Sequence, residues 1–247
     1  MKALDIARLA GAAGLACALG MASQQAGAAV VLNGCAGGSF GAACGLDELI
    51  AGGSIEIDSA QFSGFTIDNF GGRVLDTSAI RVDPIAQFLN PGLTFVDTAS
   101  VLSVSDGEFT LNNLAFNVTM VGSELKIGGN SIALAVGGIT PGSSSNNVAV
   151  SEILLDPGMV DTLSHIFVIC DGASPGICPN GTSAAAGFTP IGGVLVIGQV
   201  DVFSDVGGAA ALTGFSLQFA QVPEPGTLAC LAVGLVALSS RRRRPAA

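Results

Sequence analysis

The side chains of this 247-residue chain that could carry out nucleophilic chemistry are few. His165 is the sole histidine, and Ser164 stands beside it. Nucleophilic catalysis requires a base within hydrogen-bond reach of the nucleophile. In a strand, adjacent side chains point to opposite faces, so Ser164 and His165 would not form such a pair. No G-x-S-x-G motif occurs, and we interpret His165 as a residue at a strand end rather than a catalytic base.

Acidic side chains are the most abundant candidate groups. Residues 29–222 contain 17 acidic and three basic residues (Arg73, Arg81 and Lys126), hence a net charge of −14. Glycoside hydrolysis requires two carboxylates across a cleft. Because 17 acidic residues offer many possible pairs, the sequence does not indicate which pair, if any, would line one. The charge disfavours nucleic acid and anionic polymers as partners. The scarcity of basic residues and the absence of Walker or G-x-G-x-x-G motifs also disfavour a phosphate site.

A net negative charge of this size would favour metal cations as ligands. The simpler interpretation is that the acidic residues keep the domain soluble. Ca²⁺ takes several oxygen ligands from loops. Acidic residues near predicted turns are Asp97, Asp106, Glu108, Asp156, Asp161, Asp201 and Asp205. None belongs to an EF-hand or a Gly-Asp nonapeptide repeat, and turn chemistry explains Asp106 without a metal. We therefore assign no cofactor and no metal ligands, and calcium stays an open alternative.

Aromatic residues bear on sugar binding, because sugar rings stack on aromatic faces. The chain has no Trp and no Tyr. We predict core positions for Phe62, Phe65, Phe109, Phe116, Phe167, Phe203 and Phe215. This distribution weakens both a glycosidase and a stacking lectin, although polar contacts could still bind sugars.

Four cysteines lie between the terminal segments: Cys35, Cys44, Cys170 and Cys178. An even number of cysteines is typical of two disulfides in a domain that lies outside the reducing cytoplasm. The short spacings favour Cys35–Cys44 and Cys170–Cys178, each closing a Gly-rich loop, and the two other connectivities stay open. A zinc site is the alternative, but no C-x-x-C occurs and the histidine is far from a ligand spacing.

The elements that must position these residues are mostly strands. Period-two alternation predicts strands at 54–58, 101–105, 109–113 and 215–219, and apolar runs predict strands buried on both faces at 132–136, 166–170 and 194–197. Helical character is confined to 47–51 and 157–164, and the polar stretch 141–147 is predicted to be a loop. Regular turn signals such as Asp106-Gly107 separate the strands. We predict an all-β fold, a β-sandwich or jelly roll.

The sequence patterns at both ends of the chain are typical of export signals. Residues 1–28 have a positive start (Lys2, Arg8), an apolar stretch and an Ala26-Gly27-Ala28 cleavage site, which together predict a secretory signal peptide with an N-terminal helix. Residues 223–247 begin with Pro223, Glu224, Pro225 and Gly226 and end with Arg241, Arg242, Arg243 and Arg244 before the last three residues.

The stretch between these two clusters is predicted to form a short hydrophobic helix. Gly226 to Ser240 would span about 22 Å as a helix, against a hydrocarbon core of about 30 Å. The arginines would hold their end in the cytoplasm by the positive-inside rule. The predicted topology places the domain outside and the C-terminus inside. An uncleaved N-terminal anchor and an ordinary C-terminal span are the alternatives at the two ends.

This tripartite tail resembles the PEP-CTERM sorting signal of exported bacterial proteins. In that family an exosortase recognises and processes the tail at the membrane, and the mature protein passes to the cell surface or the polysaccharide matrix. A second similarity concerns Cys44 to Ile57 followed by Phe62-Ser63-Gly64-Phe65, which is similar to the opening of many PEP-CTERM ectodomains. That similarity implies a β-sandwich and names no activity.

The sequence thus predicts a signal peptide at 1–28, a β-sandwich ectodomain at 29–222 and a sorting signal at 223–247. The implied partners are the Sec translocon, signal peptidase and an exosortase, with an inner-membrane intermediate before surface or extracellular release. We expect a non-enzymatic surface or matrix protein associated with exopolysaccharide or biofilm. The alternatives are a carbohydrate- or Ca²⁺-dependent adhesion module and a secreted hydrolase.

Overall fold

The computed structural model of this protein describes residues 28–36, 42–141, 143–173, 178 and 181–224. Residues 28–222 form one compact unit. Most of the predicted signal peptide, Pro225, Gly226, the terminal helix and the arginine cluster lie outside the described residues. Within the described part of the chain, no helix has the length and apolar character needed to cross a membrane.

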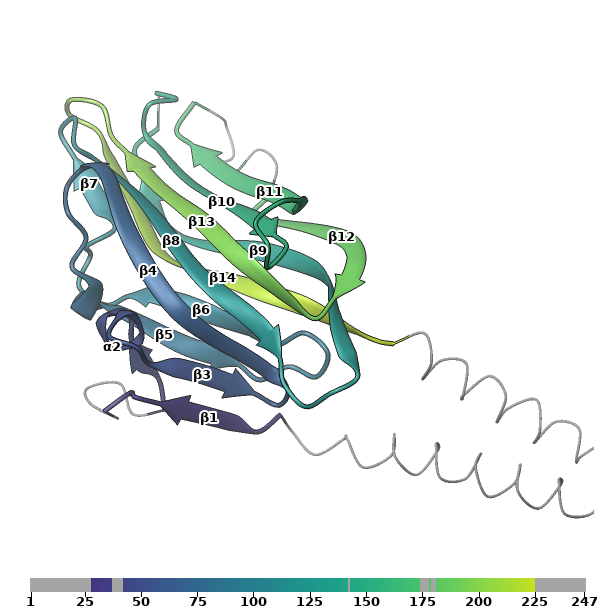
Figure 1. The fold of residues 1–247 in the computed structure, drawn as a ribbon. Coiled ribbons are helices and arrows are strands. Elements are labelled where there is room, and N and C mark those ends of the chain that lie inside the picture. The colour runs from purple at the N-terminus through teal and green to yellow at the C-terminus, as the bar shows by residue number, and fades with distance from the viewer. Residues whose placement is uncertain (1–27, 37–41, 142, 174–177, 179–180, 225–247) are drawn as a thin grey trace, which may run out of the picture. The chain divides into compact units, whose positions relative to one another are not determined.

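Seven strands form the first sheet, which we call sheet A and which faces the viewer in Figure 1. Its neighbouring strands are antiparallel along the whole sheet. In spatial order the strands are β1 (Val30–Asn33), β3 (Ser54–Ile57), β4 (Ala60–Gly72), β8 (Phe109–Met120), β13 (Gly193–Phe203), β10 (Asn147–Leu155) and β11 (Thr162–Asp171).

The second sheet, sheet B, lies behind sheet A in Figure 1. Its strands in order are β12 (Ser183–Ile191), β9 (Leu125–Ile139), β14 (Ala209–Pro223), β6 (Gly92–Asp97), β5 (Ile80–Ile85) and β2 (Cys44–Gly45), and β7 (Ser103–Ser105) also pairs with β14. The all-β sandwich prediction is confirmed.

Each sheet buries one face only, which corrects part of the strand prediction. Runs 132–136, 166–170 and 194–197 were predicted to be buried on both faces, yet their burial alternates. In β11, for example, Val168 is buried whereas Phe167 is 61% exposed. Strands in a two-layer sandwich have a core side and an outer side. The prediction was wrong because apolar residues on the outer side hide the alternation in the sequence.

Phenylalanine rings fill the centre of the sandwich. Phe62 and Phe116 from sheet A meet Phe95 and Phe219 from sheet B, and the Phe62 and Phe219 ring centroids are 5.8 Å apart. Core placement is correct for Phe62, Phe65, Phe116 and Phe215.

Core placement is wrong for three phenylalanines, which lie on the outer side of sheet A. Phe109 is 38% exposed, Phe167 is more exposed still, and Phe203 is half-buried. All three alternate with buried neighbours on their strands. Next to Phe167 and Phe203 the buried neighbours include apolar residues, so hydrophobicity does not reveal which side faces the core. Next to Phe109 the buried residue is the polar Thr110, which reverses the expected order.

The non-strand elements are short. Helix α2 (Leu46–Ile50) matches the predicted turn at 47–51, and the 3-10 helix η2 (Thr77–Ala79) was not predicted. Residues 157–164 are not helical: Asp156 caps a turn there and β11 begins at Thr162. The loop prediction for 141–147 is correct at the described residues 141 and 143–146, whereas Asn147 begins β10.

Two disulfides are present, Cys35–Cys44 and Cys170–Cys178. The first joins the residue two positions past edge strand β1 of sheet A to edge strand β2 of sheet B. The second joins edge strand β11 of sheet A to the segment that leads into edge strand β12 of sheet B. Each bond therefore braces a crossing between the two sheets, at opposite sides of the sandwich.

Candidate functional site on the outer face of sheet A

The sequence candidates for nucleophilic catalysis are separated in the fold. Ser164 points into the core and is buried, and its Oγ has no hydrogen-bond partner. His165 is exposed on the outer side of β11, opposite Ile153 of β10. The two side chains cannot act on the same atom.

The turn carboxylates considered for calcium are used by the backbone. Asp97 accepts N–H groups from Ala99, Val101 and Leu102 at 2.7–3.1 Å. Asp156 accepts N–H groups from the following turn, and these bonds hold the pKa of its carboxyl below the ordinary value. Among the described residues, no three His, Cys, Asp or Glu side chains are grouped to hold a metal ion.

The basic side chains are also engaged. The Arg73 guanidinium donates to the carbonyls of Val101 and Ser103 at 2.6 and 2.7 Å. Arg81 forms a 2.8 Å ion pair with Asp83. Arg73 and Arg81 therefore hold loops and strands together and are not placed to cradle an anion.

The outer side of sheet A carries a polar row that runs across five strands. Strand pairing sets its members directly opposite one another. They are Asp68 on β4, Asn113 on β8, Gln199 on β13, Ser151 on β10 and Phe167 on β11, and the last of them ends the row with an aromatic ring. Strands lie about 4.8 Å apart, so the row is about 19 Å long.

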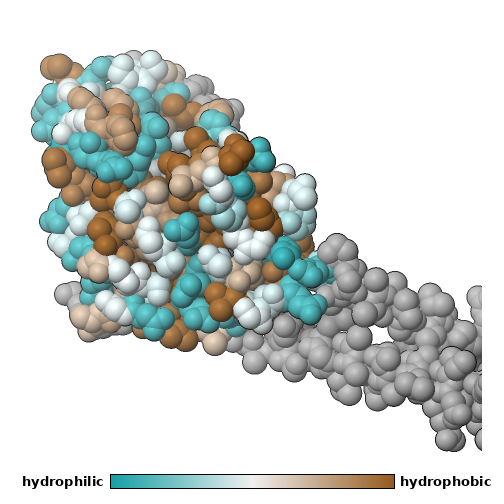
Figure 2. Space-filling view, viewed as in Figure 1, coloured by the Kyte–Doolittle hydropathy of each residue, from teal (hydrophilic) through white to brown (hydrophobic). Residues whose placement is uncertain are grey.

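Mostly apolar rows flank the polar row on both sides. One contains Leu111, Asp201, Ala149 and Ile169, and the other contains Thr66, Ala115, Ile197, Ile153 and His165. We call these three rows together the outer-face site. In Figure 2, which has the same view, hydrophobic residues are interspersed with polar ones over the middle of this face.

Asp201 is the unusual member of the outer-face site. Its Oδ2 accepts a 2.8 Å hydrogen bond from Gln199 Nε2, while its Oδ1 is covered and has no partner. Leu111 and Ala149 lie directly beside it on the neighbouring strands. Burial raises the pKa of the Asp201 carboxyl, and the Gln199 bond only partly opposes this. Asp201 therefore holds the Gln199 amide in place on the outer side of the sheet.

Phe109 and Phe203 form an aromatic pair at the end of the outer-face site. They sit opposite each other on β8 and β13, and their rings stack with centroids 5.5 Å apart and planes 4° from parallel. Gly71 makes room for this pair, since a Cβ there would lie 3.1 Å from Phe109 Cε2.

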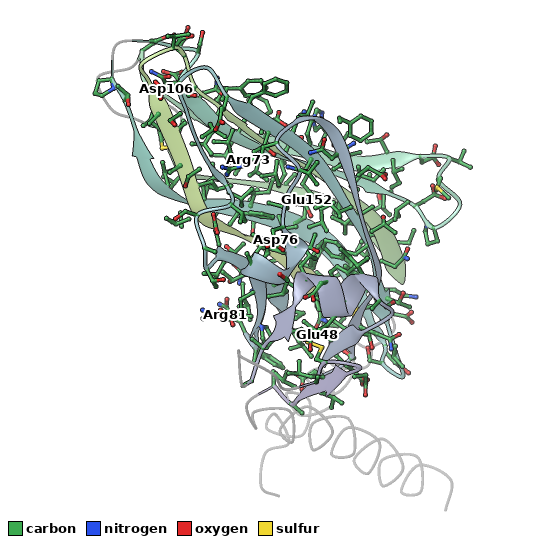
Figure 3. All side chains as sticks on the ribbon, turned by 90° about the vertical axis from the view of Figure 1, so that its left-hand side faces the viewer. Glu48, Arg73, Asp76, Arg81, Asp106 and Glu152 are labelled. Carbon is green, nitrogen blue, oxygen red and sulfur yellow. A yellow bond between two sulfur atoms is a disulfide. The ribbon has the colours of Figure 1, made fainter. Side chains whose placement is uncertain are left out.

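The interior holds a second unusual carboxyl, Glu152, which Figure 3 labels in the middle of the domain. It is fully buried on β10, and its Oε2 accepts a 2.8 Å bond from Asn130 Nδ2 of β9. Burial raises its pKa to about 8, and the Asn130 bond opposes that rise. Both Glu152 Oε1 and Asn130 Oδ1 lack partners.

Sequence reasoning missed both Glu152 and the outer-face site. The alternating segment Val200-Asp201-Val202-Phe203 contained a signal, since it places Asp201 and Phe203 on one side of a strand. The row itself required the pairing register, which no sequence pattern specified.

The predicted sorting residues lie at the limit of the described chain. Pro223 ends β14 and Glu224 follows it. Pro225, Gly226 and Arg241 to Arg244 lie outside the described residues.

Comparisons with solved structures find carbohydrate-binding β-sandwiches. One is TmCBM61 in complex with β-1,4-galactotriose (14% identity, TM-score 0.28, 63% of this chain and 88% of that chain). Another is TmCBM27, a carbohydrate-binding module with specific mannan recognition (14%, 0.24, 65% and 98%). A third is the xylan-binding module CBM86 from Roseburia intestinalis (10%, 0.22, 67% and 99%). Similarity at this level carries no information about what this chain binds.

Comparison with protein families finds the PEP-CTERM protein-sorting motif at residues 221–244. No curated protein matches the chain. The matched stretch contains the Pro-Glu-Pro sequence and all four arginines, so the resemblance seen in the sequence is confirmed. This protein is therefore an exported protein that carries a PEP-CTERM sorting motif, which implies processing by an exosortase and placement at the cell surface or outside the cell.

Proposed function

We propose that this is a non-enzymatic surface or extracellular-matrix protein, associated with exopolysaccharide in biofilm. The Sec translocon exports it, signal peptidase removes residues 1–28, and an exosortase acts on the tail. The observation that carries the proposal is the sorting motif at residues 221–244 behind a β-sandwich.

Each part of the tail has a physical role in this proposal. Pro223, Glu224, Pro225 and Gly226 form the recognition element, because prolines keep the backbone extended and accessible. The hydrophobic stretch behind them pauses the chain in the inner membrane, and Arg241, Arg242, Arg243 and Arg244 retain its end in the cytoplasm. The tail acts as a substrate and has no catalytic role.

The geometry near Ala29 supports cleavage after Ala28. The backbone N–H of Ala29 donates to Asp58 Oδ1 at 2.9 Å, and its carbonyl accepts from the Asp58 N–H at 2.9 Å. Cleavage before Ala29 would replace that N–H by an α-ammonium group in the same position. The hydrogen bond would become an ion pair, and the new terminus would remain attached to the edge of sheet A.

A non-catalytic role is supported by the separation of Ser164 from His165 and by the use of the turn aspartates and arginines in backbone contacts. A carbohydrate-binding role is the second candidate, and the outer-face site is the observation that favours it.

Intact-mass measurement on the protein from surface and membrane fractions of its host tests the sorting proposal. We expect a surface form that begins at Ala29 and ends between Pro223 and Gly226. If every molecule retains Arg241 to Arg244, the protein is a membrane-anchored surface domain and the exosortase step is wrong. If the surface form begins elsewhere, the cleavage site is wrong.

A further inference from the structure

We propose that the outer-face site of sheet A binds an uncharged polysaccharide chain that lies across the strands, along the polar row. This inference rests on the proposed placement in the polysaccharide matrix and names the ligand class and the residues that would hold it.

Shape and composition first favour a linear polyol. The polar row extends about 19 Å across five strands, with one carboxylate, two amides and a hydroxyl presented in that order before Phe167. Apolar rows on both sides offer surfaces for the C–H faces of sugar rings, and Phe167 offers a ring that is 61% exposed. A chain of sugars likewise presents hydroxyl groups beside C–H surfaces along its length.

The hydrogen-bonding groups match hydroxyls in both directions. Asn113 and Gln199 present amides that can donate and accept, and Asp68 presents a carboxylate that only accepts. Asp201 Oδ1 lacks a donor in the free protein. Because that oxygen is covered, Asp201 serves the site by holding the Gln199 amide through its Oδ2 at 2.8 Å.

Charge decides between classes of polymer. The site contains Asp68 and Asp201 and no Lys or Arg, and residues 29–222 carry a net charge of −14. Anionic polysaccharides and a second copy of this face would both be repelled. The apolar rows favour contacts with the C–H faces of sugar rings over a purely electrostatic contact with a polycation. An uncharged polymer therefore fits best.

Affinity electrophoresis of the mature protein from its host tests the proposal, with three uncharged polymers (mannan, dextran and hydroxyethyl cellulose), anionic alginate and cationic chitosan in separate gels. We expect at least one uncharged polymer to retard the protein, with little change as salt is raised. Alginate should not retard it. Retardation by none of the uncharged polymers overturns the proposal, as does binding to chitosan alone that salt abolishes.

Site variants locate the surface. Phe167→Ala and Gln199→Ala should each weaken binding about fivefold to tenfold. Matched controls on the other side are Phe88→Ala, which removes an exposed ring between β5 and β6, and Gln218→Ala, which removes a hydrogen-bonded amide on β14. If the controls weaken binding as much as the site variants, the outer-face assignment is wrong.

Two further readouts separate the possible failures. Urea unfolding of each variant distinguishes loss of the site from loss of the fold. The mass of the surface form reports on sorting independently, so a correctly processed protein that binds no uncharged polymer overturns this inference alone. Release of reducing ends from a bound polymer would instead indicate the hydrolase and would contradict the non-enzymatic proposal.

Discussion

Glu152 and Asp201 present nearly the same local pattern in two different regions of the molecule. Each carboxyl accepts one 2.8 Å bond from a side-chain amide, and each leaves its other oxygen covered and unpartnered. Glu152 lies between the sheets, whereas Asp201 lies on the outer side of sheet A. Burial raises the pKa of both.

The difference between them is what surrounds each carboxyl. No ligand can reach Glu152, but a proton can: a protonated Oε1 can donate to Asn130 Oδ1, which also lacks a partner. The inward residues opposite Glu152 on β11 and β13 are Ile166 and Gly198, and no other buried side chain among the described residues can carry a charge. The interior carboxyl therefore affects stability, while Asp201 holds Gln199 on the outer side of the sheet.

The largest effect that would sharpen this comparison is expected from Glu152→Gln at alkaline pH. The unfolded chain ionises Glu152 near its ordinary pKa of 4.5, whereas the folded chain holds the proton up to a pKa of about 8. The contribution of this proton to folding stability is therefore full below pH 4.5 and is lost as the pH rises from 4.5 to 8, by a total on the order of 5 kcal/mol. Glu152→Gln removes this loss and is expected to be more stable than the parent at pH 8.

Urea unfolding from pH 5 to pH 8 checks this prediction. Glu56→Gln, on the outer side of β3, is the control and should keep the parent slope. Equal slopes in Glu152→Gln and the parent would show that Glu152 is ionised in the folded protein.

The second prediction removes the amide partner in each region. Asn130→Ala leaves a buried acid without its donor and should cost about 2 kcal/mol at pH 5. Gln199→Ala leaves a half-buried acid that water can solvate, and should cost less than about 0.5 kcal/mol. Thermal or urea unfolding of both variants at the same pH measures the difference, and equal costs would break the comparison.

A third prediction concerns Asp201→Asn. Burial raises the pKa of the Asp201 carboxyl, and the change to Asn removes this titrating group. Folding stability should change by less than about 0.5 kcal/mol, and any loss of stability that Asp201 causes as pH rises should disappear. Binding to the uncharged polymer should weaken severalfold, because an amide oxygen accepts the Gln199 hydrogen bond less strongly than a carboxylate and holds that side chain less firmly. A large stability loss with unchanged binding would assign Asp201 a structural role.

The smallest effect is expected from Asp58→Asn, which extends the comparison to an exposed carboxylate. In the mature form its ion pair with the Ala29 α-ammonium should contribute no more than about 1 kcal/mol. The contribution should disappear as pH rises through the α-amino pKa and the ammonium loses its proton. The check is to measure the unfolding midpoint against pH for two forms of the protein, one that begins at Ala29 and one with a residue before Ala29. Identical pH profiles of the two forms would contradict the ion pair.

Much of the architecture was predictable because it depends on local patterns. Turn pairs such as Asp106-Gly107 adopt positive φ in the structure, as their composition indicated. The local cysteine spacings favoured the disulfides that the structure contains. Phe167 was assigned to the core wrongly because Ile166, Phe167 and Val168 are all apolar, and hydrophobicity alone does not say which of them faces the other sheet.

The sequence by itself determined the all-β class, the surplus of acidic residues and the sorting motif, since each follows from composition or from residues adjacent in the chain. Only the tertiary structure decided that Asp68, Asn113 and Gln199 share a row, and that Asn130 meets Glu152. Those contacts join residues tens of positions apart, and strand order and register set them. A one-residue shift in register would move every such side chain to the other face of its sheet.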